Sequence, residues 1–347
     1  MECDVFLPGD YFYDLIYTGL PEFPTLGREV YGTGILATGG AMFITAASLR
    51  RLGVRVGWAA CFGNDEYSQY VRRLAVEEDV DLNLAQDVDR PYRRVTTAIS
   101  CQGERAFVSY ADPPPIDLDA HWLAAMRRCD FRHLHLGAMF RLERVAPLVA
   151  EARAHGATVS MDCQDVPNLA QACTWQRLLG MVDVFIPNTR EALLVSGMGT
   201  VESALQRLME WTKIVIVKDG ANGAWVGAEG AITHVPAVSA GPAVDTTGAG
   251  DCFNAGFLLG YVIESAPLEQ CARYANICGG LSVTQVGGAT AAPTRAELEA
   301  WLARLALPLT VAPNVTTPPS SSVTIENSAI ADVLSRRYCN PTWTRKR

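Results

Sequence analysis

Short apolar, strand-like runs alternate with helical patterns through most of this 347-residue chain, and this alternation most constrains its fold. The run 54–61, VRVGWAAC, predicts a strand, and a helical pattern with one apolar face follows from Glu66. The further predicted strands are 133–137, 157–162, 182–188 and 213–220, and the predicted helices between them are 141–156, 189–197 and 201–211. Strands joined by helices pair in parallel, and the helices then cover both faces of the sheet. We therefore expect an α/β protein with a mostly parallel central sheet.

Two regions interrupt the alternation. Residues 11–37 and 90–110 contain short strand patterns with no helix between them, so we expect a small antiparallel sheet that projects from the main domain. After about residue 308 the sequence becomes linker-like, with the run APNVTTPPSSSVT. We assign residues 1–307 to one domain and residues 308–347 to a C-terminal extension.

The composition argues against several classes of protein. There are 29 Lys and Arg against 37 Asp and Glu, a formal net charge of −8 with no long basic stripe, so nucleic acid is not an expected partner. The ten cysteines are scattered without a CxxC pair, which is typical of reduced thiols in the cytoplasm. We expect no signal peptide and no membrane span. His133 and His135 share one face of a predicted strand, but no third metal ligand lies near them in the sequence, so we assign them no chemistry.

The most informative stretch is DTTGAGDCFNAGF, residues 245–257. Aromatic residues spaced at i, i+4 and i+8 predict a buried helix that begins near Gly250 or Asp251. The unpaired amide groups at a helix start attract anions, and Gly248, Ala249 and Gly250 are small enough to let a phosphate group approach. The loop is therefore predicted to hold phosphate or a developing negative charge.

Asp251 stands at the mouth of this loop. A carboxylate beside an anion-binding loop can accept a proton from an attacking hydroxyl while backbone amides stabilise the transferred phosphoryl group. A glycine-rich turn in which Asp251 caps the helix explains the same stretch. Taken alone, the motif leaves both interpretations open.

The stretch resembles the C-terminal signature of the ribokinase family, the phosphofructokinase B (PfkB) type of carbohydrate kinases. Shorter segments resemble the same family in the same order, across roughly residues 4–306. They are GDYFYD near the start, the pair Gly39 and Gly40, CFGND at 61–65, PNTRE at 187–191, VKDGANGA at 217–224 and ANICGGLSVTQVGGA at 275–289. The resemblance implies a ribokinase-like three-layer fold with a small β-strand lid over the acceptor site.

The resemblance also implies roles for individual residues. Asp251 matches the family's catalytic base, and residues 248–250 match its anion hole. Asp14 matches an acid that binds sugar hydroxyls together with the backbone of Gly39 and Gly40, although Asp14 also fits an acid in a surface turn. Because a helical pattern follows the glycine pair directly, we expect these glycines to let the substrate approach a helix start.

Other matching positions concern the nucleotide and the metal. Asn188 and Glu191 lie at i, i+3 spacing in the first turn of a predicted helix, and the family organises Mg²⁺ through water with such a pair; helix capping is the alternative. Lys218 and Gly220 match the place where the family binds nucleotide phosphate and ribose, and Asn276 matches a position beside the adenine. Lys218 also fits a solvated strand end, and Asn276 a helix side chain with its hydrogen bonds satisfied.

Asp245 and Thr247 match positions where some family members bind a monovalent cation such as K⁺. Local hydrogen bonds within the turn are the stronger explanation for this pair.

The acceptor half departs from the family pattern. Ile44 stands where the family usually carries Asn, Ser68 replaces a glycine, and Asp162, Cys163 and Gln164 replace Asp-Pro-Asn. An isoleucine offers no hydrogen bond to a substrate hydroxyl, so we expect the acceptor to have an apolar or missing group facing Ile44.

We therefore expect ATP-dependent phosphorylation of a primary hydroxyl on a sugar or sugar-like molecule, in a homodimer formed through the lid. A nucleoside kinase on the same fold is one alternative. A nucleotide or sugar sensor without turnover is another, although the intact Asp251 favours an enzyme. A Rossmann dehydrogenase ranks last, because no GxGxxG follows the first strand.

Overall fold

The computed structural model describes residues 1–101, 104–138, 141–164 and 172–306. Residues Met1–Ala306 form one unit, and the predicted extension 308–347 lies outside the described residues. Within the described ranges, every helix is too short or too polar to cross a lipid bilayer.

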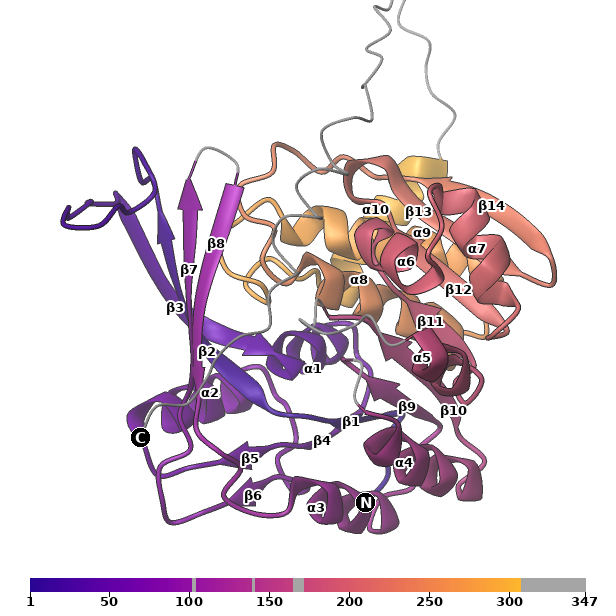
Figure 1. The fold of residues 1–347 in the computed structure, drawn as a ribbon, viewed down its shortest axis with the longest axis horizontal. Coiled ribbons are helices and arrows are strands. Elements are labelled where there is room, and N and C mark those ends of the chain that lie inside the picture. The colour runs from indigo at the N-terminus through magenta and orange to yellow at the C-terminus, as the bar shows by residue number, and fades with distance from the viewer. Residues whose placement is uncertain (102–103, 139–140, 165–171, 307–347) are drawn as a thin grey trace, which may run out of the picture. The chain divides into compact units, whose positions relative to one another are not determined.

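Eight strands form the main sheet of the unit Met1–Ala306 (Figure 1). In chain order they are β1 (Val5–Pro8), β4 (Val56–Ala59), β9 (His133–Leu136), β10 (Thr158–Asp162), β11 (Val184–Ile186), β12 (Ile214–Lys218), β13 (Gly223–Ala228) and β14 (Ala231–Pro236). Their order in space is β14-β13-β12-β11-β10-β9-β1-β4. The six strands from β12 to β4 pair in parallel, and β13 and β14 pair antiparallel. The predicted mostly parallel sheet is confirmed.

Helices cover both faces of this sheet, because successive strand residues point to opposite faces. Phe185 packs into one core, and its neighbours Val184 and Ile186 pack into the other. The Val184 face is covered by α1 (Met42–Arg51), α2 (Glu66–Glu77), α8 (Ala249–Leu258), α9 (Leu268–Ser282) and α10 (Arg295–Ala306). The Phe185 face is covered by α3 (Leu118–Arg127), α4 (Leu142–Ala154), α5 (Ala172–Leu179), α6 (Thr189–Ser196) and α7 (Val201–Met209). The expected three layers are therefore present.

A second, four-stranded sheet projects from the α/β body as the lid (Figure 1). Its strands are β2 (Tyr11–Thr18), β3 (Gly34–Ala41), β7 (Arg94–Cys101) and β8 (Glu104–Ala111), in the order β3-β2-β7-β8. The expectation of a wholly antiparallel sheet is wrong, since β2 and β7 pair in parallel. The chain forms α1, β4 and α2 between these two strands, and a parallel pair needs such a crossover.

One predicted strand is split. The run 54–61 forms β4 and then β5 (Cys61–Phe62), which leaves the main sheet and pairs with β6 (Gln86–Asp87). The helix predicted from Glu66 is confirmed as α2, and the Asp65 side chain caps it by accepting from the Ser68 amide.

Candidate active site

The site is built around the first turn of α8, near the carboxyl ends of the parallel strands. Gly248 caps this helix with φ 69°, a left-handed conformation that favours glycine. A Cβ at Gly248 would lie 2.7 Å from the Cα of Gly288 and 2.7 Å from Cδ1 of Ile44, so no larger residue fits. The Ala249 amide donates to the Thr246 carbonyl at 3.3 Å, and anion binding by residues 248–250 stays a prediction.

Asp251 lies in this first turn and is held by another helix. The Thr45 hydroxyl, in α1, donates to Asp251 Oδ1 at 2.9 Å. Burial and the negative charge of Asp162 raise the pKa of Asp251 to about 7, although the Thr45 hydrogen bond and the Lys218 charge act to lower it. A carboxyl group whose pKa lies near neutrality is well matched to general base catalysis.

Lys218 ends β12 and lies beside this turn. Its Nζ donates to both carboxylate oxygens of Asp162, at 2.7 and 2.8 Å, across the sheet at the end of β10. Asn254, one turn after Asp251 on α8, donates from Nδ2 to Asp162 Oδ2 at 2.6 Å. The Lys218 Nζ is 3.4 Å from the position of a Cβ at Gly250, so its positive charge lies against the start of α8.

Asp14 and the glycine pair form the acceptor side. The Asp14 side chain is buried, and burial, followed by the negative charges of Asp251 and Asp245, raises its pKa to about 7. A Cβ at Gly40 would lie 2.1 Å from Asp14 Oδ2, and one at Gly39 would lie 2.3 Å from the ring of Phe43. The space that these glycines leave is thus filled by the protein's own side chains, and substrate binding by their backbone stays a prediction.

Ile44 does not form the acceptor wall that its position in the sequence suggested. Its side chain is 2% exposed, and it packs against Gly248 and Gly288 beneath the phosphate loop. The expected preference for an acceptor with an apolar group at this point therefore has no structural basis.

Asn188 and Glu191 form a capping box at the start of α6. Asn188 Oδ1 accepts from the Glu191 amide at 2.9 Å, and Glu191 Oε2 accepts from the Asn188 amide at 2.8 Å. Asn188 also forms a β-bridge with Lys218, which places the box beside the end of β12. This box is the capping alternative, and a role of the pair in holding Mg²⁺ through water stays a prediction.

The other predicted site residues have structural contacts. Asn276 Nδ2 donates to the backbone carbonyls of Val235 and Pro236, in line with the alternative of a helix side chain whose hydrogen bonds are satisfied within the protein. Asp245 Oδ1 accepts from the amide and hydroxyl of Thr247, as expected for a hydrogen-bonded turn. Gly220 begins a short 3-10 turn with φ 54°, directly after β12 and its Lys218.

These groups place a carboxyl with a raised pKa, a half-buried ammonium and the start of α8 at one edge of the sheet. Residues 36–295 match the family described as pfkB family carbohydrate kinase. The chain belongs to the pfkB family of carbohydrate kinases.

Individual pfkB proteins are similar to this chain over most of its length. A fructokinase from Klebsiella pneumoniae is 30% identical over 285 residues, which cover 75% of this chain and 90% of that protein. The structure of Vibrio cholerae fructokinase with fructose, ADP and calcium is 25% identical, with TM-score 0.69, covering 86% of this chain and 99% of that one. The structure of an Escherichia coli putative ribokinase II with ATP and Mg²⁺ is 24% identical, with TM-score 0.72, covering 87% and 99%.

The resemblance seen in the sequence is therefore confirmed, and so are the ribokinase-like fold and the enzyme class. This pfkB kinase catalyses ATP-dependent sugar phosphorylation.

Three residues near the pfkB site were not predicted to act there. Thr45 lies inside a helix pattern, Asn254 inside a buried apolar helix, and Asp162 was noted only as part of a departure from the family. The sequence could have predicted Asp162, since an acid at the carboxyl end of a buried parallel strand lies where α/β proteins bind ligands. The contacts of Thr45 and Asn254 depend on residues about 90 or more positions away.

The buried histidines have structural roles, in agreement with the sequence analysis. His133 bonds to the hydroxyls of Thr158 and Ser160, and His135 bonds to Ser160. Burial lowers the pKa of His133 to about 3 and that of His135 to about 4, so both rings stay neutral at physiological pH.

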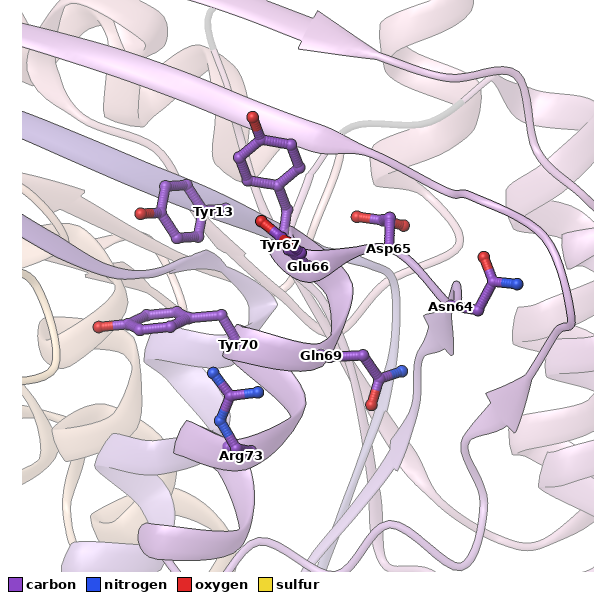
Figure 2. A pocket seen from close by; sticks show the side chains of 8 residues that line it. All are labelled: Tyr13, Asn64, Asp65, Glu66, Tyr67, Gln69, Tyr70 and Arg73. Atoms are coloured by element: carbon purple, nitrogen blue, oxygen red, sulfur yellow. The ribbon is translucent and has the colours of Figure 1, made fainter.

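A pocket of about 380 Å³ opens at the foot of the lid, away from the reacting groups. Figure 2 shows Tyr13, Tyr67 and Tyr70 gathered at one end of it, with Arg73 beside Tyr70. Tyr13 and Asp14 are successive residues of β2 and so point to opposite faces of the lid. The pocket therefore lies on the other face of β2 from the acceptor side.

Proposed function

We propose that this carbohydrate kinase phosphorylates a primary hydroxyl of a free sugar, with fructose the first acceptor to test. The observation that carries the proposal is that helix α1 connects the two acids: Gly40, just before this helix, leaves room for the Asp14 carboxylate, and the Thr45 hydroxyl of α1 donates to Asp251. Asp14 is then placed to hold sugar hydroxyls beside the base. The fructokinase from Klebsiella pneumoniae, 90% of which this chain covers, supports fructose as the acceptor.

In the proposed mechanism the acceptor hydroxyl attacks the γ-phosphorus of ATP. A bond forms between the sugar oxygen and phosphorus, the bond from phosphorus to the β,γ-bridging oxygen breaks, and the hydroxyl proton passes to Asp251. The amides of residues 248–250 and the Lys218 ammonium stabilise charge on the transferred group. The products are the sugar phosphate and ADP.

Asn188 and Glu191 are proposed to hold Mg²⁺ through water next to the phosphates. Mg²⁺ supplies positive charge that offsets the charge developing on the phosphate oxygens. Gly220 is proposed to approach the ribose, and Asn276 the adenine, from the neighbouring segments. A K⁺ site at Asp245 and Thr247 is a further proposal, tested by the dependence of the rate on K⁺ against Na⁺.

The lid is proposed to close over the acceptor and to join two subunits. Apolar side chains on one face of the lid are well exposed, among them Ile35 at 62% and Val108 at 66%, with Tyr110 on the same strand and face as Val108. Covering such a surface is a usual reason for a dimer. Light scattering of the purified protein measures its oligomeric state, and Val108→Asp should shift a dimer toward monomer. The free, buried cysteines fit the proposed cytoplasmic location.

The deciding experiment is ADP release with fructose, ribose and a set of nucleosides, each against a blank without acceptor. We expect the highest kcat/KM with fructose. Preferential turnover of a nucleoside would establish the nucleoside kinase instead. ATP binding without ADP release for any acceptor would support a sensor.

A further inference from the structure

We propose that Thr45 is a positioning residue for the catalytic base: its hydroxyl fixes one carboxylate oxygen of Asp251 and turns the other toward the acceptor. This inference rests on the proposed role of Asp251. Thr45 is fully buried in α1, and its Oγ1 donates to Asp251 Oδ1 at 2.9 Å. The two residues are 206 positions apart, so the contact exists only in the folded protein.

The hydroxyl of Thr45 is used in an unusual way for a helix. A threonine inside a helix commonly bonds back to a carbonyl one turn earlier, but here the hydroxyl bonds to another helix. A β-branched side chain is also stiff about χ1, so it holds a partner in one place. A buried, rigid donor is suited to fixing the direction of a carboxylate.

Neighbouring residues of α1 hold both ends of the phosphate loop. Ile44 packs beneath Gly248, and Thr45 bonds to Asp251 at the other end. The same helix begins two residues after Gly40, whose missing side chain makes room for the Asp14 carboxylate. Helix α1 thus links the acceptor side of the site to the base.

The charged groups around Asp251 determine how the Thr45 hydrogen bond affects its ionisation. Asp162 and Asp14 are the negative groups that face it, from β10 and β2, and Lys218 is the positive group, from β12. Against burial and Asp162, the Thr45 hydroxyl helps to stabilise the ionised carboxylate. Removal of the hydroxyl should therefore both loosen the base and leave less of it ionised at neutral pH.

The test compares Thr45→Ser with Thr45→Ala, which differ by one oxygen atom, and adds Thr45→Val, which keeps the shape without the hydroxyl. We expect Thr45→Ser to keep kcat within about threefold, and the other two to lose about 10- to 100-fold, the usual effect of removing a hydrogen bond to a charged group. The acidic limb of kcat against pH should move to higher pH in Thr45→Ala and Thr45→Val. The KM for ATP should change little, since the base does not bind ATP.

Ser48→Ala is the matched control. Ser48 lies one turn further along α1 and joins the same two helices, with its Oγ 3.4 Å from Cys252 Sγ. We expect Ser48→Ala to keep the kcat and the pH profile of the unchanged protein. Equal losses in Ser48→Ala and Thr45→Ala would show that helix packing alone matters, and the inference would then be wrong.

A second measurement does not need turnover. Because the hydroxyl stabilises the charged form of Asp251, Thr45→Ala should lose more Tm relative to Thr45→Ser at pH 8.5 than at pH 5.5, where the carboxyl is protonated. The same difference at both pH values would overturn the inference even if no acceptor is ever phosphorylated. Failure of the proposed function is separate, since it appears as no ADP release from the unchanged protein.

Discussion

Asp14 and Asp251 are two acids from distant parts of the chain, and burial raises the pKa of each to about 7. Their other surroundings differ. Asp251 has the Thr45 hydroxyl and the Lys218 ammonium to favour its charged form, whereas the charged groups acting on Asp14 are the acids Asp251 and Asp245. The proposed mechanism therefore gives the ionised, proton-accepting role to Asp251.

Asp251→Asn should lower kcat by about 10²- to 10⁴-fold, because the amide keeps the size of the side chain but accepts no proton. In the unchanged protein, kcat should fall as the pH drops through about 7, since the base is then protonated. The kcat of the purified variant and a pH series measure both effects, with ATP binding as the control for folding. A variant with nearly normal kcat would remove Asp251 from the role of base.

The same substitution should stabilise the fold at alkaline pH. A carboxyl whose folded pKa is raised destabilises the protein above that pKa, and this penalty fades as the pH falls from about 7 toward 4. Asp251→Asn should therefore have a higher Tm than the unchanged protein at pH 8.5, and the gain should shrink at pH 5. Thermal unfolding at both pH values checks this, and a gain that grows toward acid pH would contradict it.

At the scale of elements, two helix starts form the proposed phosphate side of the site. Gly248 caps the first turn of α8 without a side-chain hydrogen bond, and Gly288 and Ile44 leave no room for a Cβ at this position. The first turn of α6 is closed by its own capping box, Asn188 with Glu191. In the proposed mechanism, the start of α8 offers amides to an anion and the start of α6 offers carboxylate charge to a cation.

Gly248→Ala should lower kcat strongly, because it adds a Cβ 2.7 Å from the backbone of Gly288 at a left-handed φ and must displace the loop. Gly230→Ala is the matched control: its φ is 78°, but no atom lies within 4 Å of the added Cβ. We expect Gly230→Ala to lose only about 1 kcal/mol of stability and no kcat. Equal kcat in the two variants would show that the loop tolerates the added methyl group.

Glu191→Gln separates the charge of this residue from its capping role, since Gln also caps at the same position of a capping box. We expect a higher Mg²⁺ concentration for half-maximal rate, with a smaller change in the acceptor KM and little change in Tm. A Mg²⁺ titration of the rate measures the first effect. An unchanged titration would leave Glu191 as a capping residue alone.

At the scale of the whole molecule, the unit Met1–Ala306 contains both hydrophobic cores and every described site residue. The last helix, α10, belongs to this unit, because Leu298 is buried and Trp301 packs against the same core. The eight-stranded sheet has a hydrophobic core on each face, and the lid is a separate four-stranded sheet of the same unit.

A chain that ends at Ala306 should therefore keep its fold and its kinase activity. We expect a single cooperative unfolding transition, a Tm within a few degrees of the full chain, and the same kcat. A chain cut before Arg295, which lacks α10, is the control and should lose stability. Loss of activity in the chain ending at Ala306 would give residues 307–347 a role in catalysis.

The sequence by itself determined the layers of the fold and the phosphate loop. Both depend on local patterns: alternating residues choose a face of the strand, and small residues before a helix expose its amides. The run 245–257 therefore predicted where α8 begins to within about two residues. The spacing of Asn188 and Glu191 likewise predicted that they share one turn, where the structure shows the capping alternative, and their Mg²⁺ role stays a prediction.

Only the tertiary structure decided which side chains meet at that loop. Ile44 and Thr45 are adjacent in the chain, yet one packs under Gly248 and the other bonds to Asp251. The ion pair of Asp162 with Lys218 likewise joins two strand ends 56 positions apart. Such contacts depend on how whole helices and strands pack, and the free energy of that packing is shared among many distant residues, so no local pattern carries it.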